Sequence, residues 1–427
     1  MLSIAASLFA LPTSSDAQPL SSFLRAAITH SPDQRESEAI TRQRTEERLQ
    51  ALGRLLPSLS ARAGYTRNQV QVSVTLPPET GSTTTRQAII TPYDQVELSV
   101  TLDVPVLDLG ALARLDAARM SEEGAQDRAR GSRDELRRSV TRSYFQWVGA
   151  AALQRASERA LVVSTQSVER LRARLSAGSA TQLDVLRAEA EQARAQQSVA
   201  ESMLTTMSAA RALASSTGIT PAAQPPTLDV SLDDVGELSQ WEDGAQQSPA
   251  IRAAEADVRV ANAQSRAAWM ALAPTLNATA TERVTNAAGF GVPATFSAGV
   301  NLQWRLDVSA IAAARASSVA RTVADERVRR AEITARDQVH SAWLSARVGI
   351  ERARAARAQV LASEAAAAAA RERLTSGTAT ELEVLQADRD ALSANVSKIQ
   401  TDADLAYARV ALRIASSRLS ASEGGTQ

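Results

Sequence analysis

The sequence predicts an α+β membrane protein built by internal tandem duplication. Three observations support this fold class. Similar segments occur twice in the same order, each copy contains strand-like stretches of alternating polarity, and each copy contains a very long helical stretch. Only 3% of the 427 residues are aromatic, whereas alanine, leucine and arginine are abundant. This composition suits long helices better than a large compact core.

Two offsets define the duplication. "HSPDQRESEA", from His30, is similar to "QSPAIRAAEA", from Gln247, at an offset of 217 residues, whereas Gly178 and Gly377 match at an offset of 199. Such self-similarity is the strongest signal in the chain. It predicts five segments: a signal-peptide-like segment at 1–18, a first repeat at 19–217, a Pro-rich connector at 218–236, a second repeat at 237–419 and a flexible tail at 420–427.

The difference between the offsets is an insertion in the first copy. It amounts to 18 residues and falls between Tyr65 and Leu107. The insertion includes "LPPETGSTTTRQAIITPY", which is rich in Pro, Gly and Thr. We therefore expect a longer exposed loop in the first copy.

The N-terminal segment is typical of an exported protein. An apolar run from Leu2 to Leu11 is followed by small residues near Ala17, although the usual basic residues before the apolar run are missing. The alternative is a frayed apolar N-terminus. No stretch reaches the ~18 apolar residues that a transmembrane helix needs. If the protein enters a membrane, strands must do so.

Composition argues against catalysis and against nucleic-acid binding. The 47 basic and 47 acidic residues balance, so no general attraction to nucleic acid is expected. Cysteine is absent, and the only histidines are His30 and His340, which disfavours thiolate and histidine metal sites. There is also no phosphate-binding GxxxxGK[ST] loop. We expect no catalytic residues, no metal, no cofactor and no enzyme activity.

Each repeat predicts a helical segment followed by two strands. The helical segment of about 35 residues ends at Pro57 in the first copy and at Pro274 in the second. Strands begin near Leu59 and Leu276, and the first shifts register before Val70, as at a bulge. The other two strands alternate over ~10 residues. Their apolar positions are Val96, Leu98, Val100, Leu102 and Val104 in the first copy, and Phe296, Ala298, Val300, Leu302 and Trp304 in the second.

Two kinds of structure fit these four strands. One is a soluble antiparallel sheet. Against it, the polar positions carry Glu97, Asp103 and Arg305, and no second patterned sheet is available to cover the apolar side. The strand length and the alternation fit a transmembrane β-barrel. Because four strands cannot close a barrel alone, several chains must contribute to it.

The longest predicted elements are two helical hairpins. Helical stretches at 109–177 and 308–376 contain no proline and reach roughly 100 Å each. Leu161, Val168 and Leu175 are spaced by seven, and each stretch is followed by a returning helix with a 3–4 apolar spacing. Coiled-coil-like hairpins are therefore predicted in both copies.

The hairpin turns have helix-end signals. Gly178 and Gly377 suit helix C-termini, because glycine tolerates a positive φ. Thr181 and Thr380 are candidate N-caps of the returning helices. Asp184 and Glu383 follow three residues later, as in a capping box. Capping alone is enough to explain both carboxylates.

The chain resembles the outer membrane efflux protein family, the TolC-like channels. The resemblance covers 19–419 and is carried by "GSATQLDVLRAEAE" and "GTATELEVLQADRD", by "PSL" and "PTL" before the strands, and by "VPVLDLG" at a strand-to-helix junction. It implies a homotrimer with four strands per chain, twelve in total. The barrel would lie in outer-membrane lipid of a Gram-negative bacterium and continue into a coiled-coil tunnel extending into the periplasm. The implied function is the exit duct of a tripartite efflux or type I secretion system. Such a duct passively conducts substrates from an inner-membrane transporter to the exterior.

The resemblance also implies site residues. The hairpin tips would dock a periplasmic adaptor protein, and Asp184 and Glu383 match family positions that form an acidic ring at the tunnel mouth. The Arg and Tyr that hold the closed state in the best-known member are replaced here by Ala379 and Leu374. Any closed-state lock must therefore differ. The implied tip residues are Gly178, Thr181, Leu183, Gly377, Thr380 and Leu382.

A different class of protein stays open at this point. The chain could be a periplasmic adaptor or a structural coiled-coil protein without a barrel. Adaptors normally have one hairpin flanked by β-rich domains, however, and they lack this paired arrangement of strands. Neither the cargo nor the partner pump can be named from the sequence.

Overall fold

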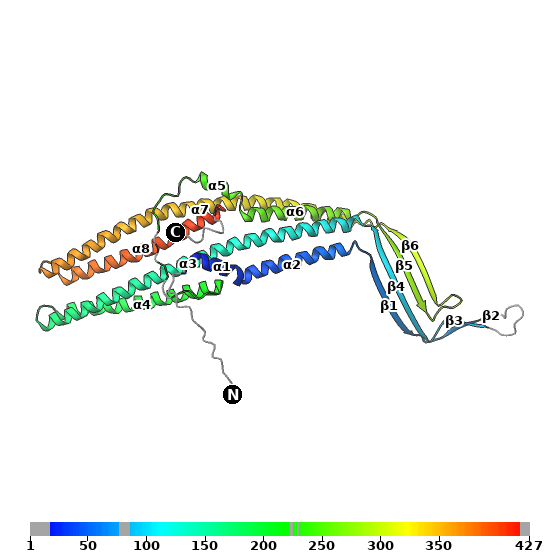
Figure 1. Ribbon diagram of the computed structural model, residues 1–427, viewed down its shortest axis with the longest axis horizontal. Coiled ribbons are helices and arrows are strands. Elements are labelled where there is room, and N and C mark those ends of the chain that lie inside the picture. The colour runs from blue at the N-terminus through cyan, green and yellow to red at the C-terminus, as the bar shows by residue number, and fades with distance from the viewer. Residues whose placement is uncertain (1–17, 77–85, 223–224, 227, 229, 419–427) are drawn as a thin grey trace, which may run out of the picture. The chain divides into compact units, whose positions relative to one another are not determined.

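The computed structural model describes residues 18–76, 86–222, 225–226, 228 and 230–418 (Figure 1). Residues 1–17 of the predicted signal-like segment and the predicted tail at 420–427 lie outside these residues, as does part of the predicted loop. The helices are α1 (Leu20–His30), α2 (Pro32–Gly53), α3 (Leu109–Ser176), α4 (Gln182–Thr217), α5 (Ser239–Ala245), α6 (Pro249–Met270), α7 (Val308–Thr375) and α8 (Glu381–Ala415). The strands are β1 (Ser58–Arg67), β2 (Val72–Leu76), β3 (Arg86–Thr91), β4 (Asp94–Leu107), β5 (Thr275–Thr285) and β6 (Ala294–Gln303).

The chain divides into two compact units. The helical unit combines the chain up to Glu38 with Arg128–Arg252 and the chain from Arg329 onward. The strand unit combines Ala39–Asp127 with Ala253–Val328.

The strand unit contains one four-stranded antiparallel sheet in the order β1-β4-β5-β6. The strand beginning at Leu59 pairs with β4 as Leu59↔Leu102, and the strand beginning near Leu276 pairs with β6 as Leu276↔Leu302. All four predicted strands are therefore present. The β4–β5 pair joins the two halves of the sequence in one sheet.

Two predictions about the first copy are wrong: that β1 and the following valines form one bulged strand, and that the whole insertion is a loop. β1 ends at Arg67, and the chain turns where the Asn68 backbone N–H donates to the Tyr93 carbonyl at 2.8 Å. Val72 and Val74 then belong to β2, which pairs with β3 in a separate two-stranded sheet. The alternating valines do form a strand, but their partner comes from the segment expected to be a loop.

The helical unit contains most of two long hairpins, α3–α4 and α7–α8, whose turns lie at the same end of the unit (Figure 1). α3 and α7 have 68 residues each and begin 199 residues apart. The predicted opening helix is divided in both copies, because Pro32 begins α2 and Pro249 begins α6. Proline has no N–H to donate and therefore favours a first turn.

Aromatic side chains anchor the first hairpin. Phe23 of α1 packs on Tyr144 and Trp147 of α3, with ring centroids 5.7 and 6.1 Å away, and Leu213 of α4 joins this cluster. Burial raises the pKa of Tyr144 to about 12. In the second copy, Trp343 is also buried and packs on α8. These buried aromatic side chains therefore pack the helices of each hairpin together.

The connector is held by a buried ion pair. Val230 packs against Ile350 and Leu405 of the second hairpin. Arg357 donates to the Asp402 carboxylate at 2.9 Å and to the Val230 carbonyl at 2.8 Å. Asp402 is only 4% exposed, so the guanidinium provides the charge that its burial requires.

Candidate functional site

One face of the four-stranded sheet is uncovered and apolar except at Glu282 of β5. Residues directly opposite each other on neighbouring strands point to the same side of a sheet, so the register places the apolar positions of β1, β4 and β6 together. Their exposed fractions run from 37% for Val100 to 73% for Leu59 and Phe296. Contiguous exposed apolar surface of this kind marks contact with a membrane or another protein. The other large members of this face are Tyr65, Val96, Leu98, Leu102, Val300 and Leu302.

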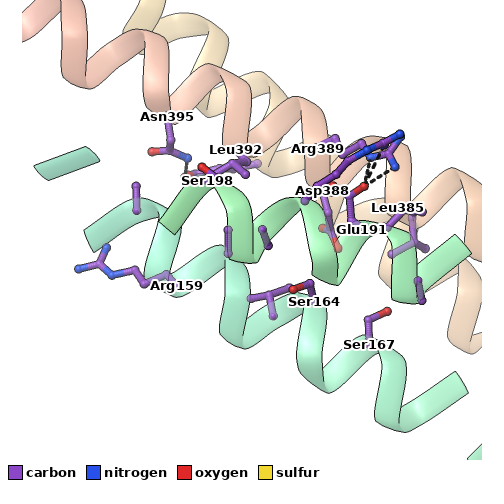
Figure 2. Close-up of a pocket in the computed structure, with 18 of the residues that line it drawn as sticks. Arg159, Ser164, Ser167, Glu191, Ser198, Leu385, Asp388, Arg389, Leu392 and Asn395 are labelled. Atoms are coloured by element: carbon purple, nitrogen blue, oxygen red, sulfur yellow. Dashed lines mark hydrogen bonds and ion pairs between the residues drawn. The ribbon is translucent and has the colours of Figure 1, made fainter. Parts of the chain in front are cut away.

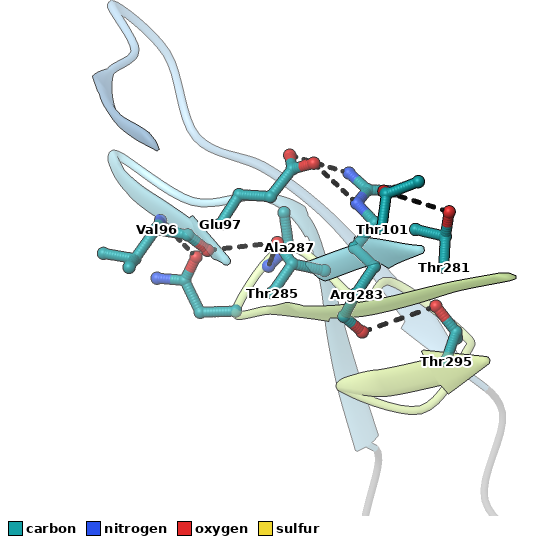
Figure 3. Close-up of polar contacts among 9 residues, drawn as sticks. Val96, Glu97, Thr101, Thr281, Arg283, Thr285, Ala287 and Thr295 are labelled. Carbon is teal, nitrogen blue, oxygen red and sulfur yellow. Dashed lines mark hydrogen bonds and ion pairs between the residues drawn. The ribbon is translucent and has the colours of Figure 1, made fainter. Parts of the chain in front are cut away.

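The opposite face of the sheet is polar. Glu97 accepts two hydrogen bonds from the Arg283 guanidinium, at 2.8 and 2.9 Å, and the Thr101 and Thr281 hydroxyls lie 3.1 Å apart (Figure 3). Bidentate pairing of this type fixes both charged side chains. Glu97 was predicted on the polar face, and its partner Arg283 comes from the other half of the chain. A sheet with one apolar and one hydrogen-bonded polar face has the two-sided character of a barrel wall.

Among the described residues, no helix has a stretch that is both long enough and apolar enough to cross a membrane.

Both hairpin turns end their first helix in the same way. Gly178 has φ 72° and Gly377 has φ 76°. In the first turn, the N–H of Ser179 donates to the Arg174 carbonyl and that of Gly178 to the Leu175 carbonyl, and the second turn repeats this pattern. This is the Schellman arrangement, which requires a left-handed residue where glycine stands. The predicted role of both glycines is confirmed.

The first turn contains a complete capping box. The Thr181 hydroxyl accepts from the Asp184 N–H at 3.2 Å, and the Asp184 carboxylate accepts from the Thr181 N–H at 3.0 Å. The Thr181 hydroxyl also donates to this carboxylate at 2.6 Å. These bonds favour the ionised form and lower the pKa of Asp184.

The second turn is capped by its threonine alone. Thr380 accepts from the Glu383 N–H at 3.3 Å, so its predicted N-cap role is also confirmed. The Glu383 carboxylate lies 3.8 Å from the Arg373 guanidinium instead of closing a full box. The Asp184 carboxylate thus accepts from both the N–H and the hydroxyl of Thr181, whereas the Glu383 carboxylate accepts only from the Thr380 hydroxyl, at 3.3 Å, and Glu383 is more exposed.

The predicted tip residues are at the surface. Leu183 is 54% and Leu382 is 39% exposed, and the glycines and threonines of both turns are exposed as well. The structure therefore brings the residues of each turn together and leaves both leucines uncovered.

A groove of about 790 Å³ separates the two hairpins near their turns (Figure 2). Two ion pairs cross it. The Arg389 guanidinium of α8 donates to Glu191 of α4, with its Nε at 2.7 Å from Oε2, and Arg174 at the end of α3 pairs with Glu381 at the start of α8. Farther from the turns, Arg142 of α3 lies over the ring of Tyr407 of α8.

Sequence reasoning missed these bridging residues. It singled out carboxylates that match between the copies, but one residue of each bridging pair has no charged counterpart in the other copy. At the offset of 199, Glu381 corresponds to Gln182 and Arg389 corresponds to Ala190. A charge present in only one copy was the signal that could have found them.

The fold defines a class of protein: a chain that joins barrel-type strands to long paired helical hairpins. The outer membrane efflux protein model matches residues 23–219 and 242–417, so the chain belongs to this family. It is an outer-membrane protein that extends into the periplasm, and the family consists of efflux channels rather than enzymes.

Solved structures share the fold. The CmeC outer membrane channel of Campylobacter jejuni is 15% identical with a TM-score of 0.79, over 99% of this chain and 95% of that one. The outer membrane protein VceC of Vibrio cholerae is 18% identical with a TM-score of 0.75, over 93% and 95%. The MtrE outer membrane channel of Neisseria gonorrhoeae, solved in its open state, is 18% identical with a TM-score of 0.75, over 94% and 89%. No curated protein matches the sequence.

Proposed function

We propose that three copies of this chain form an outer-membrane exit duct. The observation that carries this proposal is the uncovered apolar face of a sheet whose other face is polar. The sheet has two open edges, β1 and β6, and an unpaired edge requires a partner. Twelve strands from three chains give each edge a partner and close a barrel.

The hairpin tips are the proposed docking surface. A duct without an ATP-binding motif needs a partner that supplies energy, and the exposed Leu183 and Leu382 offer apolar contacts for the hairpin of a periplasmic adaptor. Together with Gly178, Thr181, Gly377 and Thr380 they form the surface that would join the duct to an adaptor and an inner-membrane transporter. The cargo would then cross the duct passively.

Asp184 and Glu383 are the proposed acidic ring at the tunnel mouth. Three chains would supply three copies of each carboxylate. The capping bonds favour the ionised form of Asp184, and Glu383 is exposed at the other turn, so both turns present an acidic side chain of the kind that a cation-selective ring uses.

The experiment is fractionation and gel analysis of the protein expressed in a Gram-negative host. The duct predicts a heat-resistant trimer in the detergent-solubilised outer-membrane fraction. Cross-linking from a photoreactive residue at position 183 or 382 should capture an adaptor. A soluble monomer in the periplasm would instead support an adaptor-like or purely structural protein.

A further inference from the structure

One carboxylate interrupts the apolar face of the four-stranded sheet. Glu282 of β5 lies directly opposite Val100 of β4 and Phe296 of β6, so its side chain points to the same side as theirs. Ala280 and Val284 flank it along β5 on this side. Glu282 is exposed, and its neighbours are apolar, within the face that the proposed duct turns toward lipid.

Glu282 has no partner in its own chain. Within the residues that the structure describes, its side chain makes no ion pair and no hydrogen bond. Its basic neighbour Arg283 points to the other face and binds Glu97. Ionisable side chains at membrane depth are rare and almost always paired, because an unpaired charge costs free energy in lipid. A partner for Glu282 must therefore come from outside the chain.

The duplication predicts how β6 meets β1 of the next chain in the proposed trimer. The pair Leu59↔Leu102 of the first copy corresponds to Leu276↔Leu302 of the second. β1 is therefore equivalent to β5 at an offset of 217, and β4 is equivalent to β6 at an offset of 200. The β4–β5 pair joins the two copies inside a chain, and the β6–β1 pair would join them between chains.

The β4–β5 register brings Arg67 to the boundary between chains. Inside the chain, Leu98 pairs with Val284. The two offsets convert this pair into Ala298 of β6 opposite Arg67 of the next chain. A basic side chain of the next chain therefore comes to the same face as Glu282.

This register keeps both faces of the sheet continuous across the boundary. It places Val300 opposite Tyr65 of the next chain on the apolar face, and Gly299 opposite Thr66 on the polar face. A shift of one residue would set the apolar side chains of one chain beside the polar side chains of the other. The alternation of the strands therefore supports the register that the repeat predicts.

Arg67 of the next chain would lie two strands away from Glu282 and two residues along. With neighbouring strands about 4.8 Å apart and a rise of about 3.4 Å per residue, the two Cα atoms are roughly 12 Å apart. Extended arginine and glutamate side chains together span this separation. Phe296 lies between them, and its ring, which is 73% exposed, offers a face to the guanidinium.

Arg67 can bind a second carboxylate. In its own chain, the Arg67 Nη1 lies 2.6 Å from both carboxylate oxygens of Asp94, and the guanidinium lies 5.6 Å from the centre of the Tyr93 ring. Nε and Nη2 take no part in these two bonds, and a guanidinium has five N–H donors in all. Because β1 is an edge strand, Arg67 is accessible from the neighbouring chain.

We propose that Glu282 of each chain pairs with Arg67 of the next chain across Phe296, on the lipid-facing side of the barrel. Three such pairs fix the register at the three boundaries between chains. Each pair also offsets the cost of a carboxylate within the apolar face. The inference rests on the homotrimer proposed above.

Replacing Glu282 by leucine separates a paired carboxylate from a tolerated one. An unpaired charge on the lipid face destabilises a barrel, so Glu282→Leu would then raise the temperature at which the purified trimer dissociates in SDS. Pairing with Arg67 predicts a lower temperature, and at the midpoint of the natural protein the trimer fraction should fall about twofold or more. A raised or unchanged temperature would overturn the proposal.

A double-mutant cycle identifies the partner. Glu282→Gln and Arg67→Gln should each lower the dissociation temperature, and the double variant should lose about as much as Arg67→Gln alone, because the same pair is removed in all three. Arg283→Gln is the matched control, since Arg283 is adjacent in sequence but binds Glu97 on the other face. Its loss should add to that of Glu282→Gln. Additive losses for positions 282 and 67 would contradict the pairing.

Paired cysteines test the register, because the natural chain has no cysteine. Val300→Cys/Tyr65→Cys sets two thiols directly opposite each other across the boundary, with Cα atoms about 5 Å apart and within disulfide reach. The control Leu302→Cys/Tyr65→Cys is shifted by two residues, which puts its Cα atoms about 8 Å apart and beyond that reach. Mild oxidation of the purified trimer should link chain to chain on a denaturing gel for the first pair and not for the control.

The outcomes separate the pairing from the duct itself. Linking of the control in place of the first pair, or of neither pair in an intact trimer, would overturn the proposed register. A natural protein that forms no SDS-resistant trimer would instead contradict the proposed homotrimer.

Discussion

At the scale of single residues, two carboxylates that are two positions apart in α8 pair with different hairpins. Glu383 follows Thr380 by three residues and lies beside the basic residue of its own hairpin. Glu381, in the first turn of the same helix, reaches Arg174 of the other hairpin. The contacts between the two hairpins are therefore made by residues that the family resemblance did not single out.

Thr181→Ala should weaken the first tip more than Thr380→Ala weakens the second. The Thr181 hydroxyl donates to the Asp184 carboxylate at 2.6 Å, whereas the Thr380 hydroxyl donates to the Glu383 carboxylate at 3.3 Å, so the first variant removes the shorter bond. Loss of an N-cap costs about 1 kcal/mol, or about fivefold in local opening. Hydrogen exchange of residues 181–187 and 380–386 measures both. Equal effects at the two turns would show that the shorter hydroxyl bond to Asp184 contributes nothing extra.

Acid should loosen the first turn through Asp184. Its pKa is lowered in the folded protein by the hydrogen bonds from Thr181, so the ionised carboxylate contributes stability above its unfolded pKa of about 3.9. That contribution is lost as pH falls through the folded pKa. Protection factors of residues 181–185 should stay constant from about pH 7 to 5 and drop below about pH 4. In Asp184→Asn this drop should be absent, and a drop of the same size there would exclude the carboxylate as its cause.

Replacing both proposed ring residues should reduce cation selectivity. Asp184→Asn/Glu383→Gln removes six charges from the mouth of a trimer, and a ring of carboxylates concentrates cations. Reversal potentials in a salt gradient across a planar bilayer give the selectivity. Unchanged selectivity together with a less stable tip would leave only the capping role.

At the scale of elements, the two faces of β4 should respond differently to the same charge. Leu98→Lys places an ammonium on the apolar face, where a lysine at the bilayer midplane costs ~2–4 kcal/mol. Thr101→Lys places it on the polar face at little cost. The yield of heat-resistant trimer in the outer membrane should fall for Leu98→Lys alone. Equal loss in both variants would contradict the membrane assignment of the apolar face.

The elements that repeat between the two copies, or that alternate in polarity, were predictable from the sequence. The 199-residue offset and the absence of proline defined α3 and α7 nearly to the residue, and period-two alternation identified β4 and β6. β3 was missed because its segment follows a Pro- and Gly-containing stretch that favours turns. The bridge between Arg389 and Glu191 was missed because it joins residues 198 apart, and no local pattern specifies such a pair.

At the scale of the whole molecule, each of the two units has its own exposed apolar surfaces. The strand unit has an apolar face that a soluble protein would cover, and the helical unit has exposed apolar tips and an exposed face on α4 at Met203, Leu204 and Met207. The proposed assembly of three chains in a membrane would cover the apolar face of the sheet and the exposed face of α4. Binding of an adaptor at the tips would complete the route to the pump.

The most direct test of this duct is the conductance of the purified, detergent-solubilised protein in planar lipid bilayers. The account predicts discrete, ohmic current steps from trimers, which appear without nucleotide or any other energy source and depend linearly on salt concentration. Trimers that insert stably but give no current steps, or steps obtained only from dissociated chains, would contradict it.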